Sequence, residues 1–161
     1  MTGSSPEPEA TATGPTIQGR AWRSLLEAHR ELIDRIEEEF KSHTPIELQQ
    51  YDVMFHVSEA SDGMRMTDLA SAVLLTKSGL TSLVDRMEAA NLVERRPDPK
   101  DRRATRIHLT AAGGRALAAA SRHHRNVVRE IWTSRMSEKE AAVIVDVLAR
   151  VRAGLLEGLE D

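Results

Sequence analysis

The segment TKSGLTSLVDRMEAANLVERRPDPKDRRATRIHLT, residues 76–110, determines how this chain folds. Its first part has the three- and four-residue apolar spacing of a helix, and Thr76 is placed to cap it. Residues 92–96 and 105–109 are typical of two short strands, and the Pro97-Asp98-Pro99-Lys100-Asp101 run between them is typical of a turn. The segment therefore predicts a helix followed by a β-hairpin.

The predicted helix has two chemically different faces. One face, which we expect to pack in the core, carries Leu80, Leu83, Val84 and Met87. The opposite face carries Ser78, Thr81, Ser82, Asp85 and Arg86. Small hydroxyl side chains near a helix N-terminus suit entry into the DNA major groove, and Lys77 there would attract a phosphate. An ordinary capped surface helix would carry the same residues, so the helix alone leaves both interpretations open.

The hairpin concentrates positive charge on a chain whose net charge is −3. Between residues 95 and 106 the two anions are Asp98 and Asp101, and the six cations are Arg95, Arg96, Lys100, Arg102, Arg103 and Arg106. An arginine at a hairpin tip can enter the minor groove, where negative potential is concentrated. Asp101 is expected to brace Arg103 or to cap the turn. A charge run is often only a solvated surface, but its position directly after the helix favours contact with DNA.

Upstream of this segment the sequence predicts three further helices and a short edge strand. The first helix spans residues 18–43, and the second begins at Thr44-Pro45-Ile46-Glu47, where Thr44 would cap and Glu47 would complete a capping box. Residues 64–66 could add a strand to the hairpin, and Thr67 is expected to cap a short third helix. The expected inward side chains of the second helix are Leu48, Tyr51, Met54, Phe55 and Val57.

Downstream, two long helices are expected. Thr110 caps the first, although Gly113 and Gly114 are each unfavourable there by about 1 kcal/mol relative to Ala. The close approach of another backbone would explain this. A capping box at Ser137-Glu138-Lys139-Glu140 opens the last helix.

The predicted fold is mainly α with a small β-hairpin, in the order helix, helix, strand, helix, helix, strand, turn, strand, helix, helix. Residues 44–110 form a winged helix-turn-helix, and residues 17–43 and 111–161 form a helical dimerisation region. Residues 1–16, rich in Pro, Gly, Ser, Thr and Glu, are expected to be a disordered tail. The long amphipathic helices carry more apolar surface than one small lobe can cover, so we expect a symmetric homodimer.

Composition and motifs exclude several classes of protein. The chain has no cysteine, which excludes disulfides and thiolate-ligated zinc. It lacks an apolar run of about 20 residues and a secretory signal, so a cytoplasmic location and no membrane partner are expected. We find no phosphate-binding loop, no His-Glu-x-x-His and no Gly-x-Ser-x-Gly, so neither an enzyme nor a cofactor is predicted. Neighbouring His123 and His124 point about 100° apart on a helix, and no metal site is predicted.

Several motifs resemble the multiple antibiotic resistance regulator (MarR) family over roughly residues 18–160. They are Thr76-Lys77-Ser78-Gly79-Leu80-Thr81, Leu83-Val84-Asp85-Arg86-Met87-Glu88, Leu92-Val93-Glu94-Arg95-Arg96, Asp101-Arg102-Arg103 and Leu109-Thr110-x-x-Gly113. The Asp-x-Arg wing followed by Leu-Thr-x-x-Gly is the most specific part. Asn91 departs from the family's usual Gly, and Ser82 from a residue that is often basic in close relatives.

This resemblance implies a dimeric winged-helix transcription factor that binds a pseudo-palindromic operator in double-stranded DNA, usually as a repressor. Small, often aromatic anionic ligands commonly relieve that binding. The match implies that Arg103 enters the minor groove and that Ser78, Thr81 and Ser82 lie on the recognition face, which Thr76 begins. The phosphate contacts it implies are Lys77, Arg86, Arg95 and Arg102.

The resemblance also implies an effector pocket to which the first helix contributes. Trp22 and His29 are seven residues apart and share a helix face, and Arg23 is an adjacent cation. This set would suit an aromatic carboxylate or a phenolic ligand. Alternatively, Trp22 and His29 are core or dimer-seam residues. An alternative for the whole chain is a winged-helix module that binds protein without sequence-specific DNA binding, against which the basic wing argues.

Overall fold

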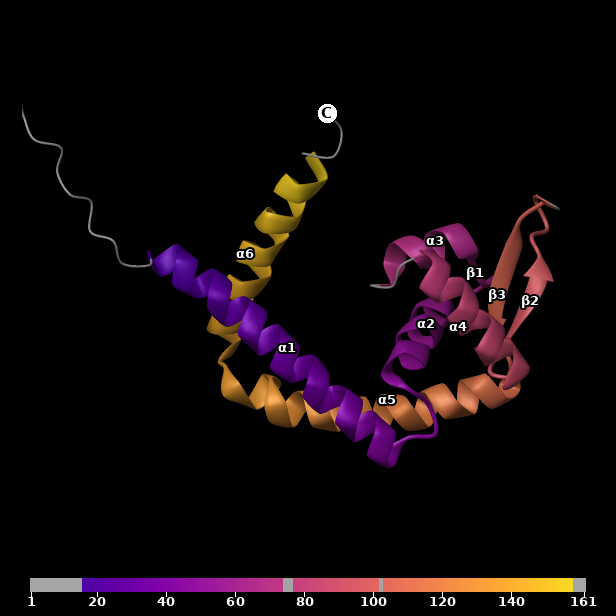
Figure 1. Cartoon of the computed structure of the whole chain (residues 1–161), viewed down its shortest axis with the longest axis horizontal. Coiled ribbons are helices and arrows are strands. Elements are labelled where there is room, and N and C mark those ends of the chain that lie inside the picture. The colour runs from indigo at the N-terminus through magenta and orange to yellow at the C-terminus, as the bar shows by residue number, and fades with distance from the viewer. Residues whose placement is uncertain (1–15, 74–76, 102, 158–161) are drawn as a thin grey trace, which may run out of the picture. The chain divides into compact units, whose positions relative to one another are not determined.

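The computed structural model describes residues 16–73, 77–101 and 103–157, and the chain divides into two compact units after Asp34. Among the described residues, the first unit holds the N-terminal part of helix α1 (Ile17–His43). The second unit holds the end of α1 and everything that follows it (Figure 1). Residues 1–15 of the predicted tail lie outside the described residues.

The predicted order of helices and strands is confirmed. The second unit contains, after the end of α1, the elements α2 (Leu48–Glu59), β1 (Met64–Arg65), α3 (Met66–Ala72), α4 (Lys77–Ala89), β2 (Val93–Pro97), β3 (Thr105–Leu109), α5 (Ala111–Ile131) and α6 (Glu138–Glu157). A short 3₁₀ helix, η1 (Thr133–Arg135), lies between α5 and α6 and was not predicted. Within the described part of the chain, none of the helices has the length and apolar character that crossing a membrane requires.

The three strands form one antiparallel sheet in the order β1-β3-β2. Val93 pairs with Leu109 and Pro97 with Thr105, so β2 and β3 form the predicted hairpin one residue later than expected on its first strand. Residue 92 belongs instead to the turn that ends α4, because its N–H donates to the Met87 carbonyl at 2.9 Å. Asn91 makes this ending possible with a φ of 55°, a left-handed conformation that Asn tolerates better than most residues.

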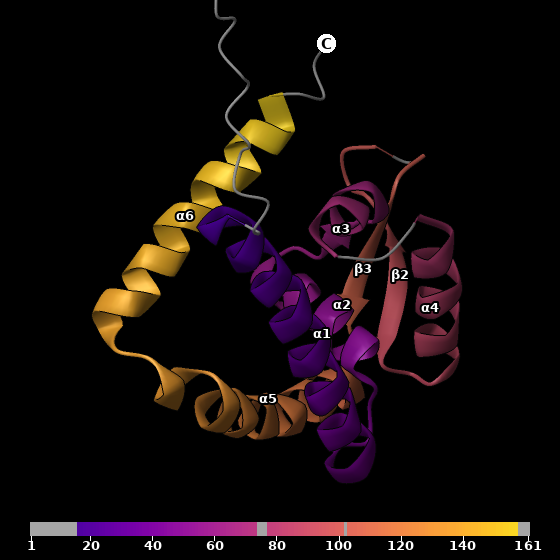
Figure 2. The same cartoon turned by 60° about the vertical axis from the view of Figure 1, so that its left-hand side comes forward.

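The core lies between the sheet and helices α2, α3 and α4, and Figure 2 shows α4 running beside β2. The predicted inner face of α4 is confirmed, since Leu80, Leu83, Val84 and Met87 are all at most 1% exposed. Equally buried side chains come from other elements of the second unit: Phe40, Met54, Leu69 and Ile107. This packing fixes which face of α4 remains outside.

Two predicted helix caps and one predicted core residue were wrong. Glu47, rather than Thr44, is the N-cap of α2, and its N–H donates the reciprocal bond of the capping box to Gln50 Oε1 at 2.9 Å. Thr44 instead donates its hydroxyl to the Phe40 and Ile46 carbonyls. Thr67 lies inside α3, whose N-cap is Arg65. Phe55 is 43% exposed because Val53 takes the inward position on α2.

The start of α5 confirms the role expected for its first glycine. Thr110 Oγ1 accepts the Gly113 N–H at 2.9 Å, so Thr110 is the cap. A Cβ at Gly113 would come within 1.9 Å of the Leu92 carbonyl oxygen, whereas a Cβ at Gly114 would meet nothing within 4 Å. Only the first glycine of the pair is therefore required by close backbone packing. The capping box at Ser137 and Glu140 is also confirmed, with Ser137 N–H donating to Glu140 Oε2 at 2.8 Å.

Candidate nucleic-acid interface

The outer face of α4 is free of core contacts. Thr81, Ser82, Asp85 and Arg86 are exposed on it, as the helical periodicity predicted. The Arg86 guanidinium makes a long, 3.4 Å contact with the Ser82 carbonyl and otherwise extends along the surface. Thr76 and the side chains of Lys77 and Ser78 lie outside the described residues. The face presents small hydroxyls beside one arginine, which leaves room for a groove edge to approach.

Arg95, predicted to contact phosphate, fastens α4 to β2. Its guanidinium donates to Asp85 at 2.6 Å and to Glu88 at 2.5 Å, while its backbone N–H donates to Glu88 at 3.0 Å. These bonds, the backbone bond above all, lower the pKa of Glu88. Asp85 therefore does not stand unpaired on the outer face, where it would repel phosphates. Two carboxylates already neutralise the charge of Arg95, so its contact with phosphate stays a prediction.

Asp98 organises the wing, defined here as β2, β3 and the turn between them, residues 93–109. Its side chain is 1% exposed. Oδ2 accepts from Arg65 Nε and Arg106 Nε, each at 2.7 Å, and Oδ1 accepts from the backbone N–H of Lys100 at 2.7 Å and Asp101 at 3.1 Å. These donors, Arg65 first among them, hold the pKa of Asp98 far below its ordinary value.

Sequence reasoning placed Asp98 in the turn and counted its negative charge, but it missed this role. A local signal exists, since an Asp between two prolines commonly bonds the backbone two residues ahead. The two arginine partners could not be found in this way, because Arg65 comes from the edge strand β1. Register explains their meeting, since Arg65 lies opposite Arg106 across the β1–β3 pair.

The wing tip is closed by hydrogen bonds that direct Arg103 outward. Asp101 Oδ1 accepts the Arg103 N–H at 3.0 Å, which confirms the cap that was one of its two expected roles. The Ala104 N–H donates to the Asp101 carbonyl at 2.9 Å. Within the described residues, the side chains of Arg103 and Lys100 are exposed and form no ion pair. Arg102 lies outside the described residues.

The number of available cations on the wing is smaller than the sequence count suggested. Arg95 is paired with Asp85 and Glu88, Arg96 with Glu94, and Arg106 with Asp98. In the described part of the wing this leaves Lys100 and Arg103 as the exposed unpaired cations. The predicted site thus separates into a supporting set that shapes the wing and a smaller set presented to solvent.

The predicted effector residues lie on α1 in the first unit. A shallow hollow of about 320 Å³ is lined by Gly19, Trp22, Arg23, Leu26, Glu27 and Arg30. Trp22 is 60% exposed, and Arg23 lies 3.9 Å from Glu27. His29 is exposed but does not line the hollow. The structure therefore groups Trp22 with Arg23 and leaves His29 outside the group.

Comparison with known proteins identifies the same fold. The MarR family model matches residues 44–104. AbsC, a MarR family transcriptional regulator from Streptomyces coelicolor, superposes with a TM-score of 0.83 at 28% identity, covering 91% of this chain and 99% of AbsC. Sco3205, a MarR family regulator from the same organism solved in complex with DNA, superposes with a TM-score of 0.80 at 26% identity, covering 87% of this chain and 92% of Sco3205.

Among curated proteins, the chain is similar to the uncharacterized HTH-type transcriptional regulator YsmB of Bacillus subtilis. The two are 33% identical over 89 residues, which is 55% of this chain. The chain spans about three fifths of the length of the first curated relatives that it matches. The family match covers the helix-turn-helix and most of the wing, and the structural matches extend over the outer helices as well. Residues 44–104 therefore belong to the MarR family of winged helix-turn-helix transcriptional regulators, and the fold of the described chain is similar to that of whole members of this family.

Proposed function

We propose that this chain is a transcriptional regulator that binds double-stranded DNA as a homodimer. The outer face of α4 would enter the major groove, and Arg103 would enter the adjacent minor groove. The observation that carries this proposal is the unpaired, exposed Arg103 on a turn held by Asp98 and Asp101, next to a helix face of small hydroxyls. An arginine held in this way is suited to the focused negative potential of a narrow minor groove. The DNA complex of Sco3205 supports the proposal by analogy.

Apolar surface on the outer helices supports a homodimer. On α6, Val143, Val147, Val151 and Leu155 are between 41% and 66% exposed, and they follow one another at four-residue steps. On α1, Ile17 and Leu25 are 64% and 42% exposed. Such stripes are normally buried against another helix. A two-fold dimer would present two α4 helices about 34 Å apart, which suits a pseudo-palindromic operator.

Arg103→Ala tests the DNA interface. We expect the variant to bind an operator, selected from a randomised duplex pool with the wild-type protein, at least about tenfold more weakly, and to lower the salt slope by about 1. Gel shifts at several matched salt concentrations measure both quantities.

The matched control for that experiment is Arg129→Ala, which removes the same charge from an exposed position on α5 where the side chain contacts only Asn126 among the described residues. Equal loss of affinity in both variants would reject the wing assignment. If the wild-type protein retards no DNA, the chain would instead be a protein-binding module.

We further propose that the regulator is a repressor released by a small aromatic carboxylate or phenol. The hollow on α1 supports this, because the Trp22 ring offers a flat apolar wall and Arg23 a countercharge. His29 would join the site only through a change in side-chain orientation. Salicylate is a suitable probe and should raise the melting temperature while lowering DNA affinity. An Arg23→Ala/His29→Ala variant that responds to salicylate as the wild type does would exclude this site.

A further inference from the structure

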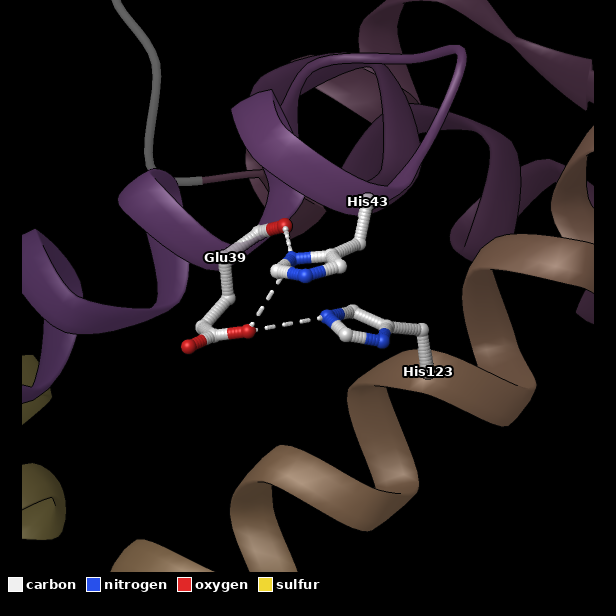
Figure 3. Close-up of side chains that lie close together, drawn as sticks. All are labelled: Glu39, His43 and His123. Atoms are coloured by element: carbon white, nitrogen blue, oxygen red, sulfur yellow. Dashed lines mark hydrogen bonds and ion pairs between the residues drawn. The ribbon is translucent and has the colours of Figure 1, made fainter.

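A second cluster of functional side chains lies away from the wing, where the end of α1 meets α5. Figure 3 shows Glu39 and His43 reaching from α1 toward His123 on α5. One ligand-type atom from each residue lies within 4.8 Å of the other two. All three residues belong to the second compact unit. We propose that Glu39, His43 and His123 form a binding site for a divalent transition metal of the zinc class.

The distances between the donor atoms match those around such an ion. Glu39 Oε2 lies 3.2 Å from His43 Nδ1 and 3.4 Å from His123 Nε2. Ligands at about 2.0–2.1 Å in tetrahedral geometry are separated by about 3.3 Å, so these two edges need almost no adjustment. Small side-chain rotations would shorten the third distance, between the two histidine nitrogens, to the value needed around an ion. Two imidazoles and one carboxylate are a donor set that zinc accepts, with its fourth position open to water.

His123 carries a further indication, independent of the spacing. Its Nε2 is buried and makes no hydrogen bond in the described part of the chain. The 3.4 Å separation from Glu39 Oε2 is an ion-pair distance only if the ring is protonated. A buried polar atom without a partner needs an explanation, and coordination of a metal ion would provide one. Its Nε2 lies beside the Glu39 carboxylate oxygen that His43 Nδ1 also approaches.

The surroundings hold the ligands in these orientations. Arg35 donates to Glu39 Oε1 at 2.6 Å, which leaves Oε2 facing the imidazoles. The His43 and His123 rings are nearly parallel, with centroids 5.0 Å apart and planes 23° apart. Buried Phe40 packs edge-on to His123 at 6.4 Å and closes the site on its inner side. Outer contacts of this kind orient metal ligands, although the Arg35 charge would reduce affinity for a cation.

His43 needs a particular tautomer to take part. Its Nδ1 lies within hydrogen-bond distance, 3.1 Å, of the Glu39 carbonyl oxygen, and it also lies near the Glu39 carboxylate. The tautomer with its proton on Nε2 leaves the Nδ1 lone pair available as a ligand. The His43 side chain is 56% exposed, so this proton has access to water.

The sequence-based expectation of no metal site weighed His43, His56 and His108 as well, but its geometric argument concerned only the adjacent pair on one helix. His123 and His124 do diverge, since the His124 ring packs against Tyr51 at 4.9 Å while His123 turns to α1. The site instead joins residues from two helices that are far apart in the sequence. Glu39 and His43, four residues apart on α1, share a face and supply two of its ligands.

Zinc titration of the tag-free chain, stripped with EDTA, tests this proposal. In competition with a chromophoric chelator, we expect one equivalent of Zn²⁺ per chain, and Co²⁺ should give the intense visible spectrum of a four-coordinate site. Glu39→Gln, His43→Gln and His123→Gln should each weaken Zn²⁺ binding at least about tenfold, since even outer contacts of metal ligands contribute this much. Circular dichroism checks folding, and exposed His43 is the safest position to substitute.

The matched control is His56→Gln, which removes another histidine of an i, i+4 carboxylate pair, 3.6 Å from Asp52. This variant should bind Zn²⁺ as the wild type does. Absence of a stoichiometric Zn²⁺ site in the wild type would overturn the proposal. Equal affinity in the three cluster variants and the control would also overturn it and would identify the binding as adventitious.

Discussion

At the scale of single residues, Asp98 shows how one buried charge sets the shape of a surface that must meet DNA. It joins the edge strand β1, the central strand β3 and the turn through four hydrogen bonds. Its two arginine partners neutralise it, and one of them, Arg106, had been counted from the sequence among the cations of the basic stretch. Burial of a charge is tolerable in this setting because each carboxylate oxygen is bonded.

We expect Asp98→Asn to loosen the wing, because the amide cannot neutralise Arg65 and Arg106. The melting temperature at neutral pH should fall by several degrees, roughly 5 °C, from the loss of charge-assisted bonds. Calorimetry measures this, with Glu94→Gln as the control because it removes an exposed ion pair of the same wing, to Arg96. Equal melting temperatures for the two variants would contradict the role of Asp98.

The same substitution carries a pH signature with a defined sign. The folded-state pKa of Asp98 lies below its unfolded value of about 3.9, so its stabilisation is present above that pH. It is lost as pH falls below about 4 toward the folded-state pKa, when the unfolded chain binds a proton that the folded chain does not. The difference in melting temperature between the wild type and Asp98→Asn should therefore shrink in acid. A difference that stays constant between about pH 6 and pH 3 would argue against this linkage.

At the scale of elements, the junction of β2 and α5 depends on one glycine of a pair. We expect Gly113→Ala to destabilise the protein by about 2–3 kcal/mol, since its Cβ would overlap the Leu92 carbonyl and overpacked backbone cannot relax easily. Gly114→Ala should be neutral or stabilising by up to about 1 kcal/mol, because the site is open and Ala favours the helix. Urea unfolding measures both, and similar midpoints for the two variants would disprove the close contact.

Helices and strands were predictable from the sequence where the local spacing of apolar residues alone determined them. The inner face of α4 and the strand Thr105–Leu109 followed from spacing alone. Helix caps were less predictable, because both Thr44 and Glu47 can cap a helix. The Thr44 hydroxyl donates to the Phe40 carbonyl instead, which leaves Glu47 as the cap. Contacts between distant segments were not predictable, as for Asp98 with Arg65 and for His123 with Glu39. These contacts depend on strand register and helix packing, which no local pattern encodes.

At the scale of the whole molecule, the exposed stripe on α6 supports the proposed homodimer. The four aliphatic side chains of this stripe are each exposed by 41% or more: Val143, Val147, Val151 and Leu155. A regulator with two exposed unpaired cations in the described part of each wing would bind DNA weakly as one copy. Two copies at groove spacing would bind one operator cooperatively, so the stripe and the wing depend on each other in the proposed function.

Val151→Asp tests this dependence. Two-fold symmetry would place the substitution twice in the interface, and loss of two buried valines at about 1.5 kcal/mol each weakens association by at least about 100-fold. Sedimentation should show a monomer, and operator affinity should fall while circular dichroism stays unchanged. Ala149→Asp adds the same charge on the opposite face of α6, so it should remain a dimer. If Val151→Asp sediments as a dimer, the α6 stripe serves another purpose, and the two wings must be held together elsewhere.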